Sequence, residues 1–120
     1  MSNVQNAYVT INNQTSVEWS PNGCEMYHGR ADGQGSVKAF TNSLVFHGVG
    51  TFGAAVGVSG YAQWHNGKAS FSVNFDCPWS EDNSGSLASI FNCDSFDITF
   101  SGPTSKSDDC NLTVTIKAKN

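Results

Sequence analysis

The chain has 120 residues, which fits one domain spanning 1–120, and its 12% aromatic content argues against disorder. Six Lys and Arg stand against ten Asp and Glu without a basic cluster, which argues against a nucleic-acid partner because affinity for phosphates depends on cations. No apolar run is long enough for a transmembrane helix, and residues 1–6 do not resemble a signal peptide. Without such a signal, we expect a cytoplasmic or non-classically released protein.

Alternation of apolar and polar residues predicts strands with one buried face along most of the chain. Many short antiparallel strands of this kind predict an all-β fold, an antiparallel β-sandwich of two sheets, with a closed barrel as the alternative. The predicted strands lie near 7–12, 16–20, 36–40, 43–47, 55–65, 68–77, 86–91, 95–101 and 111–118. The predicted turns lie at 12–14, 20–23, 31–35, 80–85 and 102–109.

A hairpin is predicted around Asn66-Gly67, because both residues tolerate the positive φ of a type I′ turn. A two-residue turn there places Tyr61 and Gln63 on the polar face of the ribbon. Apolar residues then meet across the other face, in the pairs Trp64 with Ala69, Ala62 with Phe71, Gly60 with Val73 and Val58 with Phe75. A slip of one residue would destroy this match.

Catalytic and metal-binding motifs are not found. His28, His47 and His65 are scattered, and no nucleophile-elbow, zinc-protease or phosphate-loop pattern occurs. The acidic pairs 81–82 and 108–109 lie in turn-like segments and are expected to be solvated. We therefore expect a protein without enzyme activity, metal or cofactor.

Cys24, Cys77, Cys93 and Cys110 match no metal-binding spacing. Without a secretory signal, mostly reduced and buried thiols are favoured over disulfides, although four cysteines allow three connectivities and the sequence does not choose among them. Residues 13–15 and 111–113 match the N-glycosylation pattern. We take both matches as chance.

The aromatic residues divide into two groups. Phe71, Phe75, Phe96 and Phe100 alternate with polar residues and are expected in the core. Trp19, Trp79, Tyr61 and Tyr27 lie at strand ends, on a polar face or in a predicted loop. Trp and Tyr favour membrane interfaces because one end of each side chain is apolar and the other is wet.

Three segments carry a resemblance to a known family. They are residues 57–64 (GVSGYAQW), 65–68 (HNGK) and 71–79 (FSVNFDCPW). Together they resemble the glycine-rich strand, hairpin and following strand of the aegerolysin family. Residues 9–15 (VTINNQT) and 112–116 (LTVTI) are similar to the first and last strands of the small aegerolysin-like component of two-protein insecticidal toxins.

The resemblance implies a β-sandwich without enzyme activity that binds membrane lipids, typically in sphingolipid- and sterol-rich bilayers. It also implies action at target-cell membranes, together with a larger partner toxin protein that forms the pore. A homo-oligomer on the membrane is compatible with the resemblance. The family motif carries over to Asp76, Cys77, Pro78 and Trp79. The expected lipid-binding residues are Trp79, Pro78, Asp76, Trp19, Tyr61 and Tyr27.

Two other functions stay open at this stage. A carbohydrate-binding, lectin-like module is the second hypothesis, because Tyr61 and Gln63 on a polar face would suit a sugar. An enzyme inhibitor or structural interaction domain is the third, and no residue pattern speaks for it.

Overall fold

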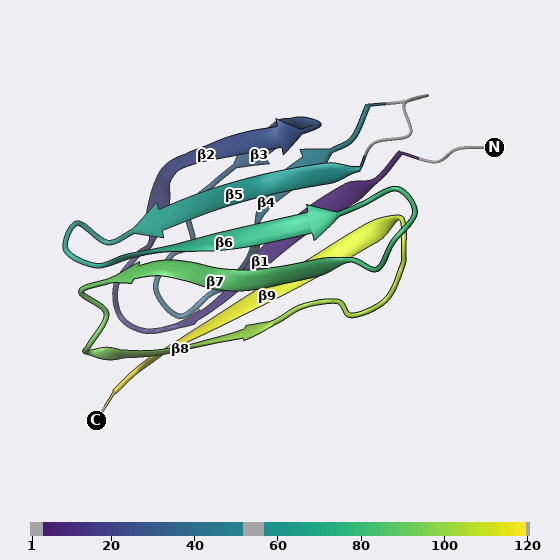
Figure 1. Ribbon diagram of the computed structural model, residues 1–120. Coiled ribbons are helices and arrows are strands. Elements are labelled where there is room, and N and C mark those ends of the chain that lie inside the picture. Colours follow the sequence, from purple (N-terminus) through teal and green to yellow (C-terminus); the bar gives the residue numbers. More distant parts are fainter. Residues whose placement is uncertain (1–3, 52–56, 120) are drawn as a thin grey trace.

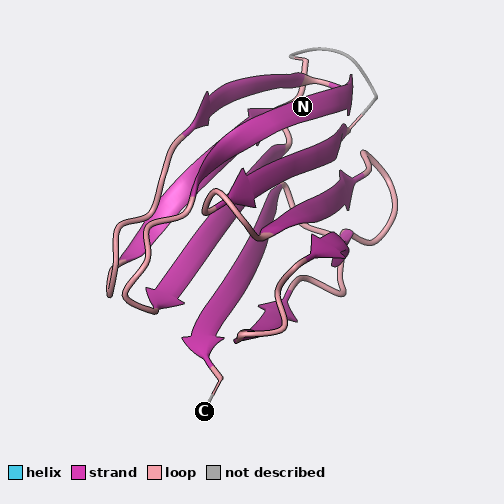
Figure 2. Ribbon diagram, turned by 90° about the vertical axis from the view of Figure 1, so that its left-hand side faces the viewer, coloured by secondary structure: helices cyan, strands magenta, loops and turns pink. Residues whose placement is uncertain are grey.

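The computed structural model describes residues 4–51 and 57–119, in which strands and loops occur without any helix (Figure 2). The strands are β1 (Asn6–Gln14), β2 (Ser20–His28), β3 (Arg30–Gln34), β4 (Asn42–Val49), β5 (Val58–His65), β6 (Ser70–Cys77), β7 (Ser84–Phe91), β8 (Phe96–Ser101) and β9 (Asp109–Ala118). A five-stranded sheet has the order β3-β4-β1-β9-β8, and a four-stranded sheet has the order β2-β5-β6-β7.

The two sheets pack face to face (Figure 1), with β1 against β5 and β6. β1 and β9 pair in parallel, whereas the other strand pairs in the sheets are antiparallel. The predicted β-sandwich is therefore confirmed, and it contains one parallel pair.

Period-two alternation explains the sandwich. In β1, Ala7, Val9 and Ile11 are fully buried, while the residues between them are partly exposed. The same alternation buries one side of β9. The inward side chains of both sheets form one core, in which the rings of Phe46 on β4 and Phe75 on β6 lie 5.3 Å apart. Burying an apolar face of each strand is what holds the two layers together.

The β5–β6 hairpin forms with a longer turn than predicted. Residues 66–69 make a four-residue turn, in which the Asn66 Oδ1 accepts hydrogen bonds from the backbone N–H groups of Lys68 (3.0 Å) and Ala69 (2.8 Å). The first cross-strand pairs are His65 with Ser70 and Trp64 with Phe71. The predicted register is thus wrong by two residues, and because a shift of two preserves the faces, the predicted buried and exposed sets stay the same.

Turns were predicted at 20–23 and 31–35, and a loop around Tyr27. Those predictions are wrong, because β2 covers 20–28 and β3 covers 30–34. β2 is the edge strand of its sheet and is mostly exposed, with register shifts after Pro21 and Met26. An edge strand tolerates Pro and Gly and shows no one-sided apolar pattern. The predicted strands 16–20 and 36–40 are reduced to an isolated bridge between Trp19 and Val37. Residues 55–56 of a further predicted strand lie outside the described residues.

The predicted turn at 12–14 is wrong, because β1 continues to Gln14 and pairs with β9 up to that residue. Asn13 organises this end of the sandwich. Its side chain is buried, its Nδ2 donates to the carbonyls of Val17 (2.7 Å) and Lys38 (3.0 Å), and its Oδ1 accepts from the Thr15 hydroxyl (2.7 Å). A side-chain amide that is used in this way is not available for glycosylation in the folded protein.

The four cysteines are free thiols in the structure, and Cys24 is the exposed one. A hydrogen bond with the Cys110 thiol, reinforced by burial, raises the pKa of Cys77 far above its usual range. Burial also raises the pKa of Cys93. Because the thiolate is the reactive form, buried thiols with raised pKa react slowly.

We expect a thiol-specific reagent to modify the native protein quickly at Cys24 and to reach Cys77, Cys93 and Cys110 only after unfolding. Mass spectrometry of the labelled peptides, with and without denaturant, measures this difference. Rapid native labelling at Cys77 or Cys110 would contradict the buried placement, and failure to label them in denaturant without reductant would reveal a disulfide.

Candidate ligand-binding site

An open groove crosses the outer face of the four-stranded sheet near the end of the sandwich where β6 finishes. We call it the outer groove, and its volume is about 540 Å³. A smaller cavity of about 280 Å³ adjoins it, and the two share His28, Ser59 and Asp76 as walls. The side chains that line the outer groove are Tyr27, His28, Ser59, Asn74, Asp76, Ser84 and Ser86.

The strand register builds the outer groove from short polar side chains. One row across the sheet runs from His28 through Ser59 and Asp76 to Ser84. In a neighbouring row, Asn74 pairs with Ser86. Serine and glycine have small side chains or none, so little covers the sheet surface here, whereas the large side chain of Tyr27 is 61% exposed and projects from it. The groove is the space between the Tyr27 ring and these small side chains.

Gly60 allows β2 to come close enough to complete the groove. A Cβ on Gly60 would collide with the backbone oxygen of Glu25 and lie 3.0 Å from the Cα of Met26. Strand β2 has a β-bulge between Met26 and His28. A bulge re-aims the side chain that it carries, and the ring of Tyr27 lies 6.3 Å from that of Tyr61 on β5.

Trp79 lies in the wall of the smaller cavity together with Pro78. It is partly buried in the segment that follows β6. Gly57 makes this arrangement possible, because a Cβ there would collide with the backbone oxygen of Cys77 and lie 2.7 Å from the Cα of Pro78. The tight crossing of the two segments holds the Trp79 indole beside the outer groove.

Negative charge dominates the electrostatics of this region. Asp76 borders both cavities, and no Lys or Arg is among the described residues that line them. Beside them, the Tyr61 hydroxyl donates a hydrogen bond to Glu25 Oε1 at 3.2 Å. Loss of the Tyr61 proton would break this bond and place two negative charges together, so Glu25 raises the pKa of Tyr61 above its usual value.

The structure brings most of the predicted lipid-binding residues together at this site, and their role in lipid binding stays a prediction. Tyr27, Asp76, Pro78 and Trp79 line the two cavities, and Tyr61 packs beside Tyr27. The prediction for Trp19 is wrong, because its side chain is fully buried and packs on the rings of Phe71 (5.4 Å) and Phe96 (5.2 Å). Trp19 therefore presents no surface to a ligand.

Sequence reasoning missed the other polar residues of the groove. His28, Ser59, Asn74 and Ser84 come from four strands, and no local motif joins them. The outward positions of β5 and β6 were predicted as polar, and this was the one feature of the sequence that pointed to a polar site on this face. The strand β2, which supplies His28, was not recognised.

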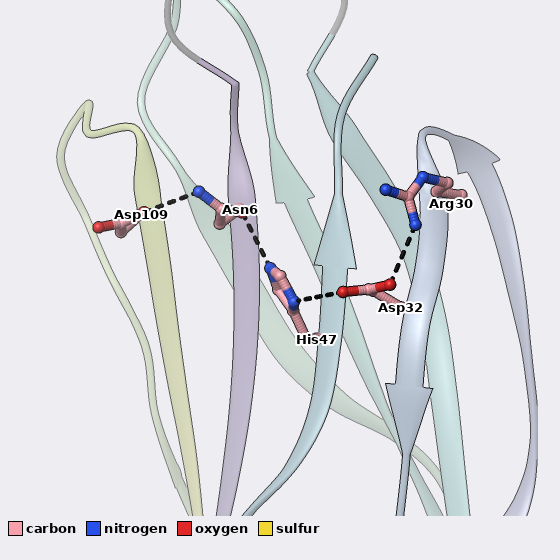
Figure 3. Close-up of polar contacts among 5 residues, drawn as sticks. All are labelled: Asn6, Arg30, Asp32, His47 and Asp109. Atoms are coloured by element: carbon pink, nitrogen blue, oxygen red, sulfur yellow. Dashed lines mark hydrogen bonds and ion pairs between the residues drawn. The ribbon is translucent and has the colours of Figure 1, made fainter. Parts of the chain in front are cut away.

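A second polar cluster crosses the outer face of the five-stranded sheet (Figure 3). The Asn6 amide donates to Asp109 Oδ1 at 3.1 Å, and its Oδ1 lies 2.9 Å from His47 Nε2. His47 Nδ1 lies 3.4 Å from Asp32, which also pairs with Arg30 at 3.1 Å. These contacts join β9, β1, β4 and β3, and the His47–Asp32 contact adds to the backbone pairing of the edge strand β3 with β4.

Within residues 4–51 and 57–119, no group of three or more His, Cys, Asp or Glu is arranged to hold a metal ion. The same residues contain no helix that is long and apolar enough to cross a membrane.

Comparisons with known proteins identify the fold. No family model matches the chain, and no curated protein matches its sequence. Among solved structures, IP-1A from Alcaligenes faecalis has a TM-score of 0.76 and 21% identity, covering 97% of this chain and 92% of that protein. RahU, solved with a TRIS molecule, has a TM-score of 0.71 and 15% identity, covering 98% and 96%. The lipid binding protein Nakanori has a TM-score of 0.74 and 12% identity, covering 96% and 71%.

The chain is therefore a β-sandwich of aegerolysin-like fold, and the resemblance that the sequence suggested is confirmed at the level of the fold. At these identities the likeness concerns the fold alone.

Proposed function

We propose that the protein binds membrane lipids without catalysing a reaction, and that the outer groove and Trp79 form the docking surface. The observation that carries this proposal is the partly exposed Trp79 in the wall of a cavity that adjoins a polar groove. An indole beside hydrogen-bonding groups suits the boundary between lipid headgroups and acyl chains. The similarity of the fold to Nakanori, a lipid binding protein, supports the proposal of lipid binding.

We further propose that the protein acts as the lipid-recognising part of a two-protein pore-forming or insecticidal toxin. This step rests on the aegerolysin resemblance, whose small members work with a larger partner. The energetics agree with an assembly: half-burial of one aromatic side chain contributes roughly 2–3 kcal/mol. Two or three such contacts correspond to a dissociation constant only somewhat below about 1 mM. Tighter binding therefore needs headgroup contacts or several copies of the protein side by side on the membrane.

Co-sedimentation with liposomes of varied sphingolipid and sterol content tests the lipid proposal. We expect the protein to sediment with at least one composition and to stay in solution without vesicles. If the protein sediments with no composition, alone or with a candidate partner toxin protein, lipid binding is refuted. Dye release from the same vesicles, with and without that second protein, tests the two-part mechanism separately.

Replacing Trp79 by alanine is expected to weaken vesicle binding more than it weakens folding. Loss of the indole removes about 2 kcal/mol of interfacial burial, roughly a thirtyfold change in affinity. The measurement is a vesicle titration paired with a thermal melt. The matched control is Phe40→Ala, which removes a 71% exposed ring near the opposite end of the sandwich. Equal losses of stability and binding in Trp79→Ala would show that Trp79 is a core residue, and a binding loss in Phe40→Ala alone would move the docking surface to the other end.

A further inference from the structure

We infer that the outer groove recognises an uncharged sugar, either as the headgroup of a glycolipid or as a free glycan. This inference deepens the proposed lipid binding and rests on it for the membrane-bound form of the ligand. It names the chemistry of the headgroup, which the proposed function leaves open. Three properties of the groove carry it: unused hydrogen-bonding groups, an exposed aromatic ring and the sign of the local charge.

The polar side chains of the groove are free to bind a ligand. Within the described part of the chain, no hydrogen bond or ion pair engages the side chains of Ser59, Asn74, Asp76, Ser84 or Ser86. Serine hydroxyls and an asparagine amide both donate and accept hydrogen bonds, and a carboxylate accepts several hydrogen bonds. A sugar ring carries hydroxyl groups with the same double capacity around its rim. The groove therefore offers complementary partners at closely spaced positions.

The Tyr27 ring supplies a platform for the apolar face of a sugar. It is 61% exposed and lines the groove, and its ring lies 6.3 Å from that of Tyr61. The face of an aromatic ring is electron-rich, so it attracts the weakly positive C–H groups on the flat side of a pyranose. Trp79 offers a second ring in the adjoining cavity, where the next sugar unit or the lipid linkage would lie.

The negative charge around the groove favours binding of a neutral sugar over binding of an anionic headgroup. Asp76 faces both cavities and Glu25 lies beside Tyr61, while no Lys or Arg lines the site among the described residues. A phosphate or sulfate placed here would meet a carboxylate without a compensating cation, and like charges brought together disfavour binding. The groove volume of about 540 Å³ falls within the range of small-molecule sites.

A matched set of vesicles tests the inference. The vesicles contain phosphatidylcholine and cholesterol with an equal mole fraction of galactosylceramide, glucosylceramide, sulfatide, sphingomyelin or sugar-free ceramide. We expect at least one neutral glycosylceramide to bind about tenfold more tightly than ceramide, a difference of about 1.4 kcal/mol. Sulfatide differs from galactosylceramide by one sulfate, and we expect that sulfate to remove the gain. In a second arm, methyl β-galactoside or methyl β-glucoside is expected to shift NMR signals of Ser59, Asn74 and Ser84.

Two variants assign the effect to the groove. Ser84→Tyr places a bulky ring in the groove from an exposed position on the edge strand β7, and it is expected to abolish the preference for glycosylceramide. Ser101→Tyr makes the same change at an exposed position on the edge strand β8 of the other sheet and is expected to bind like the wild type. Thermal melts confirm that both variants fold.

The outcomes separate this inference from lipid binding itself. Equal sedimentation with sphingomyelin, ceramide and glycosylceramide vesicles, with no glycoside-induced shifts, overturns the sugar inference and leaves lipid binding intact. Preferential binding of sphingomyelin also overturns it, in favour of the zwitterionic phosphocholine headgroup. Glycoside shifts in the groove without sedimentation on any vesicle support the sugar site and refute the membrane proposal.

Discussion

Val73→Asp is expected to prevent the protein from folding. Val73 is fully buried in β6 between its cross-strand partners Ala62 and Leu87. The substitution loses about 1.5–3 kcal/mol of apolar burial, and an uncompensated buried charge costs about 3–5 kcal/mol more. The sum is comparable with the whole stability of a domain, about 5–15 kcal/mol. Circular dichroism and a thermal melt would show loss of the cooperative transition.

The next residue on the same strand provides the control. Asn74→Asp introduces the same carboxylate with little change of shape, on the outer face where Asn74 is partly exposed. Its melting curve is expected to stay close to that of the wild type. A soluble, cooperatively melting Val73→Asp protein would contradict the assignment of faces in the hairpin, whatever its register.

The hairpin also illustrates how far the sequence determines the fold. The alternation of apolar and polar residues identified which side chains of 58–65 and 70–77 are buried, because burial has the same period of two as the strand. The register was not predictable from that alternation, because a shift of two residues buries the same set. The Asn66 side chain decides it by bonding two backbone N–H groups inside the turn.

The edge strands and Trp19 were predicted poorly for a different reason. β2 and β3 face solvent on much of their surface, so they carry no one-sided pattern to recognise. Their pairing depends on β5 and β4, which lie far away in the sequence. Trp19 precedes a Pro-Asn-Gly segment that reads as a surface turn, yet its bridge to Val37 draws the indole into the core.

The candidate site shows the same division between local and long-range information. Asp76, Pro78 and Trp79 belong to one short motif, and the sequence placed them together. Ser59, Asn74 and Ser84 meet only through the register of three strands. A groove of small polar residues has no compositional signature in a chain that is rich in serine and glycine, so the structure was needed to reveal it.

Gly60→Ala is expected to destabilise the protein strongly and to disrupt the outer groove. The added Cβ would meet the Glu25 backbone oxygen and approach the Met26 Cα at 3.0 Å. Backbone atoms of a paired strand cannot yield as a flexible side chain can, so the cost is expected at or above the upper end of the usual range for overpacking, about 3 kcal/mol. The melting temperature should fall by about 10 °C or more.

The damage should fall first on β2, because this edge strand is held in its sheet by pairing with β5 alone. Hydrogen exchange of amides 20–28 is therefore expected to accelerate more than that of 109–118, and binding that depends on Tyr27 and His28 is expected to fall as well. Gly35→Ala is the control, since a Cβ there meets nothing within 4 Å. If Gly60→Ala melted like Gly35→Ala, the close approach of β2 to β5, and with it the aromatic wall of the groove, would be refuted.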